Sequence, residues 1–179
     1  MKTKQKILIS LFAALTAVGA FIKLPIPYVP LTMQLFFVLL SGILLGGKYG
    51  LYSQLLYIII GLIGLPVFTN GGGIAYVLQP TFGYLLGFAC ASYLVGKITE
   101  YRDRLPFYFL AMYLGLIVVY LFGVIYLYGI SHYLINPSFT LKQSVWFGAI
   151  VCLPSDLIIT TFTAFLGYKL KRRIEGLKS

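Results

Sequence analysis

The sequence predicts an all-α integral membrane protein, built as a six-transmembrane-helix bundle with both termini in the cytoplasm. Hydrophobic residues make up 60% of the chain, charged residues only 10%, and the mean hydropathy is +0.94, a composition typical of membrane proteins. Residues 49–96 contain no Asp, Glu, Lys or Arg, and this run is far longer than the roughly 20 residues that one helix needs to cross a bilayer. With 179 residues, we expect a single membrane-embedded domain over residues 1–179.

Six apolar runs mark the expected spans. They cover residues 7–22, 33–45, 54–63, 81–95, 107–128 and 144–168. The first run follows several lysines and resembles a secretion signal. We interpret it instead as a span, because Ala13, Ala17 and Ala20 share one side, and small residues at this spacing let another helix approach closely in lipid.

The basic residues indicate the topology. If six spans alternate, all of the 14 Lys and Arg residues except Lys23 and Lys142 fall on the side of the N-terminus. Basic residues are retained in the cytoplasm, so we predict a multi-pass protein of the bacterial cell membrane with cytoplasmic termini. The net charge of +10 is thereby explained by topology and membrane lipid, and no nucleic-acid partner is expected.

Three irregular segments would then meet on the outer face. One is Pro-rich (residues 24–32), and Pro25, Pro27 and Pro30 favour an extended, polyproline-like strap. Thr32 is placed to cap the helix that follows. The second is the Gly-rich segment of residues 64–84, and the third is a polar loop of residues 132–142. Together they can converge over one pocket.

The Gly-rich segment is the expected wall of a binding site. Pro66, Pro80 and the glycines at 71–73 prevent a continuous helix. Uncharged, irregular backbone is tolerated near hydrocarbon only where protein buries it or where it lines a cavity. Asn70 offers a side-chain amide to a small molecule. The alternative is a surface turn that needs glycine for its conformation.

Asp156 is the only acidic residue inside an expected span. A carboxylate there opposes insertion by roughly 2.5–3.5 kcal/mol, so it normally faces the bundle interior and has a partner. Thr160 and Thr163 continue the same polar stripe. Asp156 therefore contacts a ligand, caps a helix broken near Pro154, or does both.

The sequence gives little support to a disulfide, a metal site, a cofactor or an enzyme. Cys90 and Cys152 lie in apolar runs, and His132 is the only histidine, so no disulfide, metal site or cofactor is predicted. An intramembrane enzyme is poorly supported, because no nucleophile–base pair is found. The chain has no Gly-x-x-x-x-Gly-Lys-Ser/Thr phosphate loop, so any ATP dependence must come from partner proteins.

Several stretches resemble the BioY family, the biotin-binding S-components of energy-coupling factor (ECF) transporters. The matching pieces are Ala13 to Ala17, Pro25 to Gln34, Gly61 to Phe68, Pro80 to Phe88, Tyr120 to Gly123 and Pro154 to Asp156. The resemblance implies six helices, biotin binding from outside, and docking on a shared transmembrane coupling subunit with two ATPase subunits. The Ala-x-x-x-Ala element that meets this partner would fall on Ala13 and Ala17.

The sequence also departs from the family pattern. Many members have Gly before the Asp of the last motif and Lys three residues after it, whereas this chain has Ser155 and Ile159. Tyr126 stands where the family often has Trp.

The resemblance to a biotin binder suggests a role for each candidate residue. Asp156 can accept the ureido N–H bonds, and Asn70 can pair with the ureido oxygen or the carboxylate. The backbone N–H groups near Gly71, Gly72 and Gly73 can receive the carboxylate. The expected site is completed by Gln34, at the end of the strap motif, and by the aromatic residues Phe68, Tyr84, Tyr120 and Tyr126.

Two alternatives stay open at this stage. The chain can be an S-component for another vitamin-sized acid, or a proton-coupled secondary carrier that uses Asp156.

Overall fold

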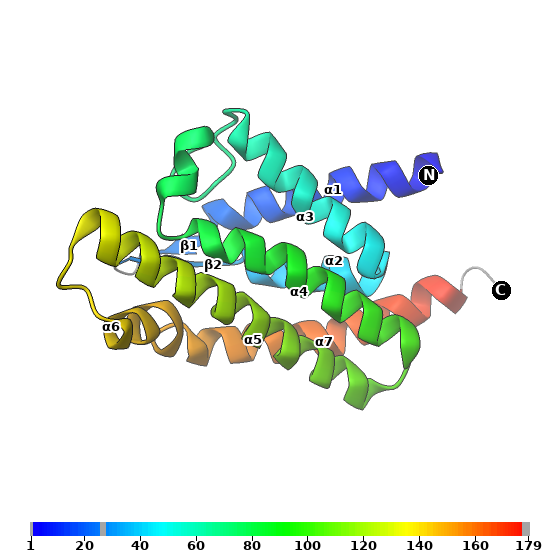
Figure 1. Ribbon diagram of the computed structural model, residues 1–179. Coiled ribbons are helices and arrows are strands. Elements are labelled where there is room, and N and C mark those ends of the chain that lie inside the picture. Colours follow the sequence, from blue (N-terminus) through cyan, green and yellow to red (C-terminus); the bar gives the residue numbers. More distant parts are fainter. Residues whose placement is uncertain (1, 26–27, 177–179) are drawn as a thin grey trace.

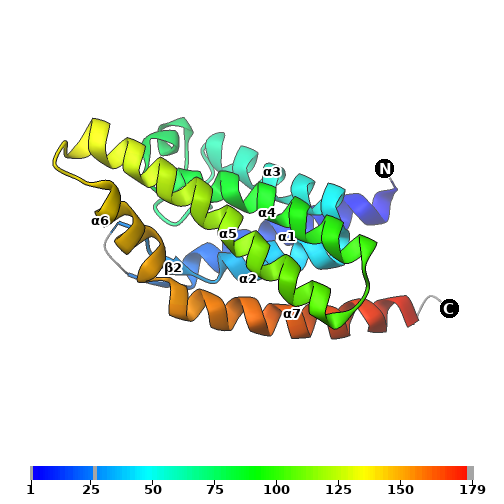
Figure 2. The ribbon, with the colours of Figure 1, turned by 60° about the horizontal axis from the view of Figure 1, so that its bottom comes forward.

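The computed structural model describes residues 2–25 and 28–176. Its long helices lie roughly along one direction (Figure 1), and the start of α1 and the end of α7 lie at the same end of the bundle in both views (Figures 1 and 2). The long helices are α1 (Thr3–Phe21), α2 (Gln34–Leu45), α3 (Gly47–Leu62), α4 (Phe82–Tyr101), α5 (Leu105–Ile130) and α7 (Leu153–Gly176).

The short elements gather toward the opposite end of the molecule (Figures 1 and 2). They are the strands β1 (Lys23–Leu24) and β2 (Leu31–Thr32), the 3₁₀ helix η1 (Ile74–Leu78), the π-helical segments η2 (Ser131–Ile135) and η3 (Trp146–Ile150), and α6 (Leu141–Val145). The three irregular segments expected from the sequence thus lie at one end of the bundle.

Only some of the described helices are long enough to cross a membrane. Thr3–Phe21, Phe82–Tyr101 and Leu105–Ile135 are long and apolar enough to cross a bilayer. A fourth candidate is the pair Leu141–Ile150 and Leu153–Ile174, which is bent by 41°. Because α2 has 12 residues and α3 has 16, they are shorter than a typical span. The structure is thus that of a helical membrane protein, and the number of crossings stays a prediction.

The outer face of α5 shows why this fold requires lipid. An exposed stripe runs along the helix at intervals of three and four residues, and every member is apolar. Its side chains are 36% to 61% exposed, and they are Leu110, Leu114, Ile117, Leu121 and Ile125. A helix that is apolar on its exposed as well as its buried face is stable against hydrocarbon, not against water.

Small residues let the central helices approach closely. A Cβ atom at Gly42 of α2 would lie 2.5 Å from the Ser92 carbonyl oxygen of α4, and one at Gly47 of α3 would lie 2.8 Å from that of Tyr93. In lipid, where the hydrophobic effect does not pull helices together, such backbone proximity supplies the van der Waals contact that holds a bundle.

A buried polar network joins four helices. The Gln54 side-chain amide of α3 donates to the hydroxyls of Thr16 in α1 and Ser41 in α2, each at 3.3 Å, and of Ser53 at 3.1 Å. The Ser41 hydroxyl lies 2.8 Å from that of Ser92 in α4. Hydrogen bonds between membrane helices fix their register, so this network specifies how α1 to α4 assemble.

The last span differs from the expected continuous run over residues 144–168. The helix begins at Leu141 and is interrupted at Val151 and Cys152, before α7 starts. Pro154 is the second residue of α7, where its missing N–H has no helical acceptor to lose. The proline therefore sets the start of a new helix instead of kinking an unbroken one.

The Pro-rich strap is a β-hairpin where the structure describes it. Lys23 pairs with Thr32 and Leu24 with Leu31 in an antiparallel ladder, so the ends of the segment are hydrogen-bonded together, unlike a polyproline helix. Tyr28 in the tip has a φ of 66°. Thr32 lies two residues before α2, and its hydroxyl accepts the Gln34 N–H at 3.4 Å.

Candidate functional site

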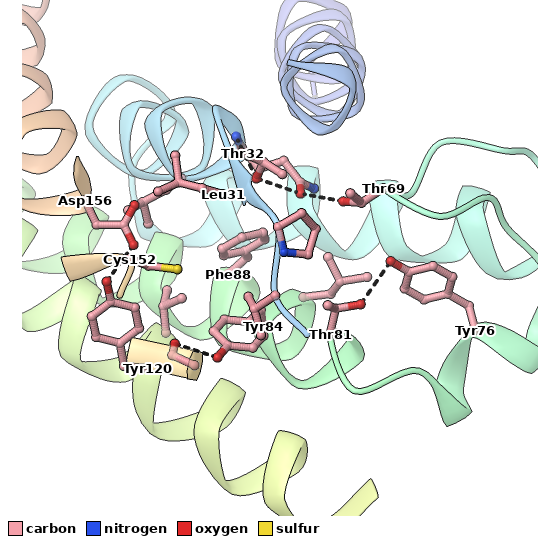
Figure 3. Close-up of a pocket in the computed structure, with 17 residues that line it drawn as sticks. Leu31, Thr32, Thr69, Tyr76, Thr81, Tyr84, Phe88, Tyr120, Cys152 and Asp156 are labelled. Carbon is pink, nitrogen blue, oxygen red and sulfur yellow. Dashed lines mark hydrogen bonds between the residues drawn. The ribbon is translucent and has the colours of Figure 1, made fainter. Parts of the chain in front are cut away.

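A pocket lies where the hairpin, the Gly-rich segment and α2, α4, α5 and α7 meet (Figure 3). Its described lining consists of Val29, Pro30, Leu31, Thr32, Gln34, Leu35, Thr69, Tyr76, Thr81, Tyr84, Leu85, Phe88, Val119, Tyr120, Gly148, Cys152 and Asp156. Asp156 is the only charged residue among them, so the site has one acidic point in a mostly apolar wall.

The acidic end of the cavity is built by α5 and α7. The Tyr120 hydroxyl donates to Oδ2 of Asp156 at 2.6 Å (Figure 3), a charge-assisted bond of the strong kind. Within the described chain, no hydrogen bond reaches the other carboxylate oxygen. Asp156 is 8% exposed, so Tyr120 orients a buried carboxylate that keeps one oxygen available to a ligand.

The position of Asp156 bears on whether its carboxylate caps the start of α7. Asp156 lies in the first turn of α7, where the helix dipole favours a negative charge by about 0.3–1 kcal/mol. Its own N–H bonds the Cys152 carbonyl at 3.0 Å. None of the hydrogen bonds described joins its carboxylate to a backbone N–H, so the structure gives no support to a capping role.

The opposite end of the cavity carries neutral polar groups (Figure 3). Oε1 of Gln34 accepts from the Thr32 hydroxyl at 3.1 Å and from the Thr69 hydroxyl at 3.4 Å. Nearby, the Tyr76 hydroxyl lies 3.1 Å from that of Thr81. The hairpin, the Gly-rich segment and α4 thus bring hydroxyl groups together, and these can donate to a ligand as well as accept.

Between the two ends the wall is apolar and rigid. Phe88 and Tyr84 lie between the acidic and the neutral polar groups (Figure 3). The Tyr84 hydroxyl donates to the Gly148 carbonyl at 2.7 Å, which ties α4 to η3 and fixes the ring. The cavity therefore suits a ligand with an apolar middle and two polar ends.

Four of the predicted site residues line this cavity: Asp156, Tyr84, Tyr120 and Gln34. They come from α2, α4, α5 and α7, and the fold brings them together from positions far apart in the sequence. Their part in ligand binding stays a prediction.

Five predicted residues lie outside the lining. Asn70 is exposed at the turn, and its neighbour Thr69 reaches the cavity instead. Phe68 is 1% exposed beneath the loop. Gly73 has a φ of +100°, and the exposed Gly72 abuts the Leu65 carbonyl. The Tyr126 hydroxyl donates to the Val77 carbonyl. In this geometry these residues shape or hold the segment, and their part in ligand binding stays a prediction.

Sequence reasoning missed several lining residues. Thr69 and Thr81 lie within the Gly-rich segment, before and after its three consecutive glycines, and Tyr76 lies in η1. Their hydroxyl groups within an uncharged, irregular stretch were the available signal, because polar side chains near hydrocarbon need partners. Cys152, expected to act as a small hydrophobe, is 4% exposed and lines the cavity.

The two alanines predicted to meet a partner helix have different environments. Ala13 is 3% exposed and belongs to the core of this chain, whereas Ala17 is only partly buried. Ala13 thus already serves the packing of α1 within the bundle. The predicted docking role is not tested by this placement.

Bundle and cavity together define the class of this chain: a helical membrane protein with a mostly apolar pocket that holds one buried carboxylate. A family model described as the BioY family matches residues 1–176, and the chain belongs to this family.

Known relatives and a solved structure agree with this assignment. The chain is 45% identical to a probable biotin transporter BioY of Lysinibacillus sphaericus, over 98% of this chain and 92% of the relative. It is 34% identical to the biotin transporter BioY of Thermotoga maritima, over 94% and 96%. A crystal structure of the S-component for biotin from an ECF-type ABC transporter matches with a TM-score of 0.70 and 28% identity, covering 96% of this chain and 95% of the other.

Proposed function

We propose that this chain is the membrane-embedded, substrate-binding S-component of an ECF transporter and that its ligand is biotin. The observation that carries this proposal is the cavity with a single oriented carboxylate at one end, neutral polar groups at the other and apolar walls between. Biotin has the matching order of groups, with a ureido ring that has two N–H donors, an apolar body and a terminal carboxylate.

The charges give the ligand a direction. Asp156 repels a carboxylate and accepts N–H groups, so the ureido ring lies at the Asp156 end, where Oδ1 takes one N–H. The carboxylate then lies toward Thr32, Thr69, Tyr76 and Thr81. Thr32 and Thr69 already donate to Gln34, but in the Tyr76–Thr81 pair the hydroxyl that accepts keeps its own hydrogen and can donate to the carboxylate. Ile159 is not part of the described lining, so the absence of lysine there leaves this orientation intact.

Transport requires partner proteins. The family relationship supports a bacterial membrane location, six crossings with cytoplasmic termini, and association with a transmembrane coupling subunit and two ATPase subunits. On α1, we expect the partly exposed Ala17 to be available to that partner, and Ala13 to act mainly inside the bundle.

The proposal is tested by titrating purified protein with biotin in calorimetry, with lipoate as a second vitamin-sized acid. We expect saturable, one-to-one binding of biotin and no comparable binding of lipoate. Mass spectrometry of ligands that co-purify with the protein identifies any other acid. Uptake that a protonophore abolishes and that ATP depletion leaves unchanged would contradict the proposal and favour a proton-coupled carrier.

A further inference from the structure

A second feature of the surface is an open groove between α5 and α7. It is lined by Phe109, Leu157, Ile158, Thr161, Phe162 and Phe165, and it shares no lining residue with the ligand cavity. Ile158 is 71% exposed and Phe162 is 56% exposed. In a membrane protein these side chains face the hydrocarbon of the bilayer, so the groove is open to lipid.

Two basic residues, Lys169 and Arg172, lie beyond one end of this groove on α7. Positions 158, 162, 165, 169 and 172 share one face of α7, because they follow the three- and four-residue spacing of a helix. The Lys169 ammonium nitrogen lies 4.3 Å from the centroid of the Phe165 ring, and the Arg172 guanidinium lies 5.1 Å from that of Tyr168. The aromatic rings thus hold two cations where the apolar lining ends.

These cations have no acidic partner among the side chains that the structure describes. The ion pair in that set is Lys97–Glu100 at 3.8 Å, and Asp103 accepts from the Tyr108 hydroxyl at 2.8 Å. Lys169 and Arg172 are exposed, and no described acidic side chain stands between them and an anion.

We propose that the groove binds one acyl chain of an anionic phospholipid, with its phosphate held by Lys169 and Arg172. The dimensions agree: from Ile158 to Lys169 the helix rises by roughly 16 Å at ~1.5 Å per residue, and one leaflet of hydrocarbon is about 15 Å thick. A chain lying along the groove therefore places its headgroup at the level of the two cations. This site is separate from the proposed biotin site.

Native mass spectrometry of the full-length protein in detergent, titrated with palmitoyl-oleoyl phosphatidylglycerol or the matching phosphatidylcholine, tests the proposal. We expect the anionic lipid to be retained preferentially. Lys169→Gln should reduce its retention about fivefold, the effect of one basic residue near an anionic headgroup. Thr161→Trp, which fills the groove, should reduce retention of both lipids.

The matched control is Lys4→Gln, which removes the same charge from an exposed position at the same end of the bundle. We expect it to leave lipid retention unchanged. If Lys4→Gln lowered retention of the anionic lipid as much as Lys169→Gln, or if the two lipids were retained equally, the attraction would be non-specific. Either result would overturn the proposal. Retained biotin binding shows that each variant is folded.

Photo-crosslinking separates lipid from a protein occupant. A benzoylphenylalanine placed at Phe162 in cell membranes should yield lipid adducts. A single protein adduct of defined mass would identify the groove as a subunit interface instead, and would overturn the lipid assignment.

Discussion

At the residue scale, Asp156 is buried, and one of its carboxylate oxygens accepts a hydrogen bond from Tyr120. The other oxygen has no described hydrogen bond. These properties suit a side chain that recognises N–H donors. The same carboxylate would be costly in an apolar wall if it had no ligand or partner.

Asp156→Asn preserves the shape of the side chain and leaves an oxygen to accept from Tyr120, but removes the charge-assisted bond to the ligand. We expect biotin affinity to fall by roughly 1.5–3 kcal/mol, about ten- to a hundredfold, in titration calorimetry. Asn70→Ala is the comparison variant, because Asn70 is exposed and outside the lining, and we expect a smaller effect from it. Unchanged affinity in Asp156→Asn, with folding verified, would remove Asp156 from the binding site.

Lys23 brings a positive charge to a residue at the neutral end of the cavity. Its ammonium donates to the Thr69 carbonyl at 2.7 Å, and the Thr69 side chain lines the cavity. An exposed cation pairs with a carboxylate by up to ~1 kcal/mol, so Lys23→Gln should weaken biotin binding by up to about fivefold.

Biotin methyl ester separates charge from shape in this experiment. The ester has no carboxylate, so its affinity should be equal in the wild type and in Lys23→Gln. Lys142→Gln, at the other basic residue expected on the outer side, is the matched control. Equal losses for biotin and its ester would show that Lys23 supports the fold of the hairpin and not the carboxylate.

At the scale of elements, the hairpin tip is pinned by aromatic contacts. The Tyr28 ring lies 5.1 Å from the ring centroids of both Phe139 and Phe147. Val29 to Thr32, directly after it, line the cavity. The segment that covers the site is thus anchored to the region around α6 and η3, although residues 132–142 contribute nothing to the described lining.

Tyr28→Ala should loosen this cover and speed biotin release. Each aromatic pair contributes about 0.5–1.5 kcal/mol beyond its burial, so the loss of two pairs should raise the dissociation rate about five- to a hundredfold. Stopped-flow displacement measures the rate, and hydrogen exchange at Val29 measures the loosening. Tyr133→Ala is the control, because that ring is 77% exposed at the same end. Equal rates in both variants would contradict the role of Tyr28.

At the scale of the whole molecule, the ends of the bundle differ in charge and shape. The end with α1's start and α7's C-terminus carries most of the basic residues, and the other end carries the hairpin, η1 and α6 (Figures 1 and 2). Cation–aromatic pairs, such as Lys48 with Tyr52 and Lys97 with Tyr93, lie on helix surfaces near the basic end. This asymmetry is typical of a protein held in one orientation by its basic residues.

The topology follows from this asymmetry. With the native cysteines replaced, a cysteine at Asn136 should react with a membrane-impermeant maleimide in intact cells, and one at Arg173 should react only after lysis. Both positions are exposed, so access and not burial decides the outcome. The reverse labelling pattern would invert the predicted orientation.

Some features of this protein follow from the sequence alone, because they depend on composition and local preference. The apolar runs predict a membrane bundle, the prolines and glycines predict where helices end, and an isolated Asp156 in a span predicts a functional carboxylate. These signals need no knowledge of which residues are neighbours in space.

Only the tertiary structure decided which side chains meet. Thr69 reaches the cavity and the exposed Asn70 does not, because the direction of a loop side chain depends on the path of the folded backbone. Tyr120 pairs with Asp156 because α5 and α7 pack side by side. The strap is a hairpin because Lys23 and Leu24 find partners in Leu31 and Thr32. Each of these results depends on the path of the folded backbone, which the residue types along the sequence do not fix.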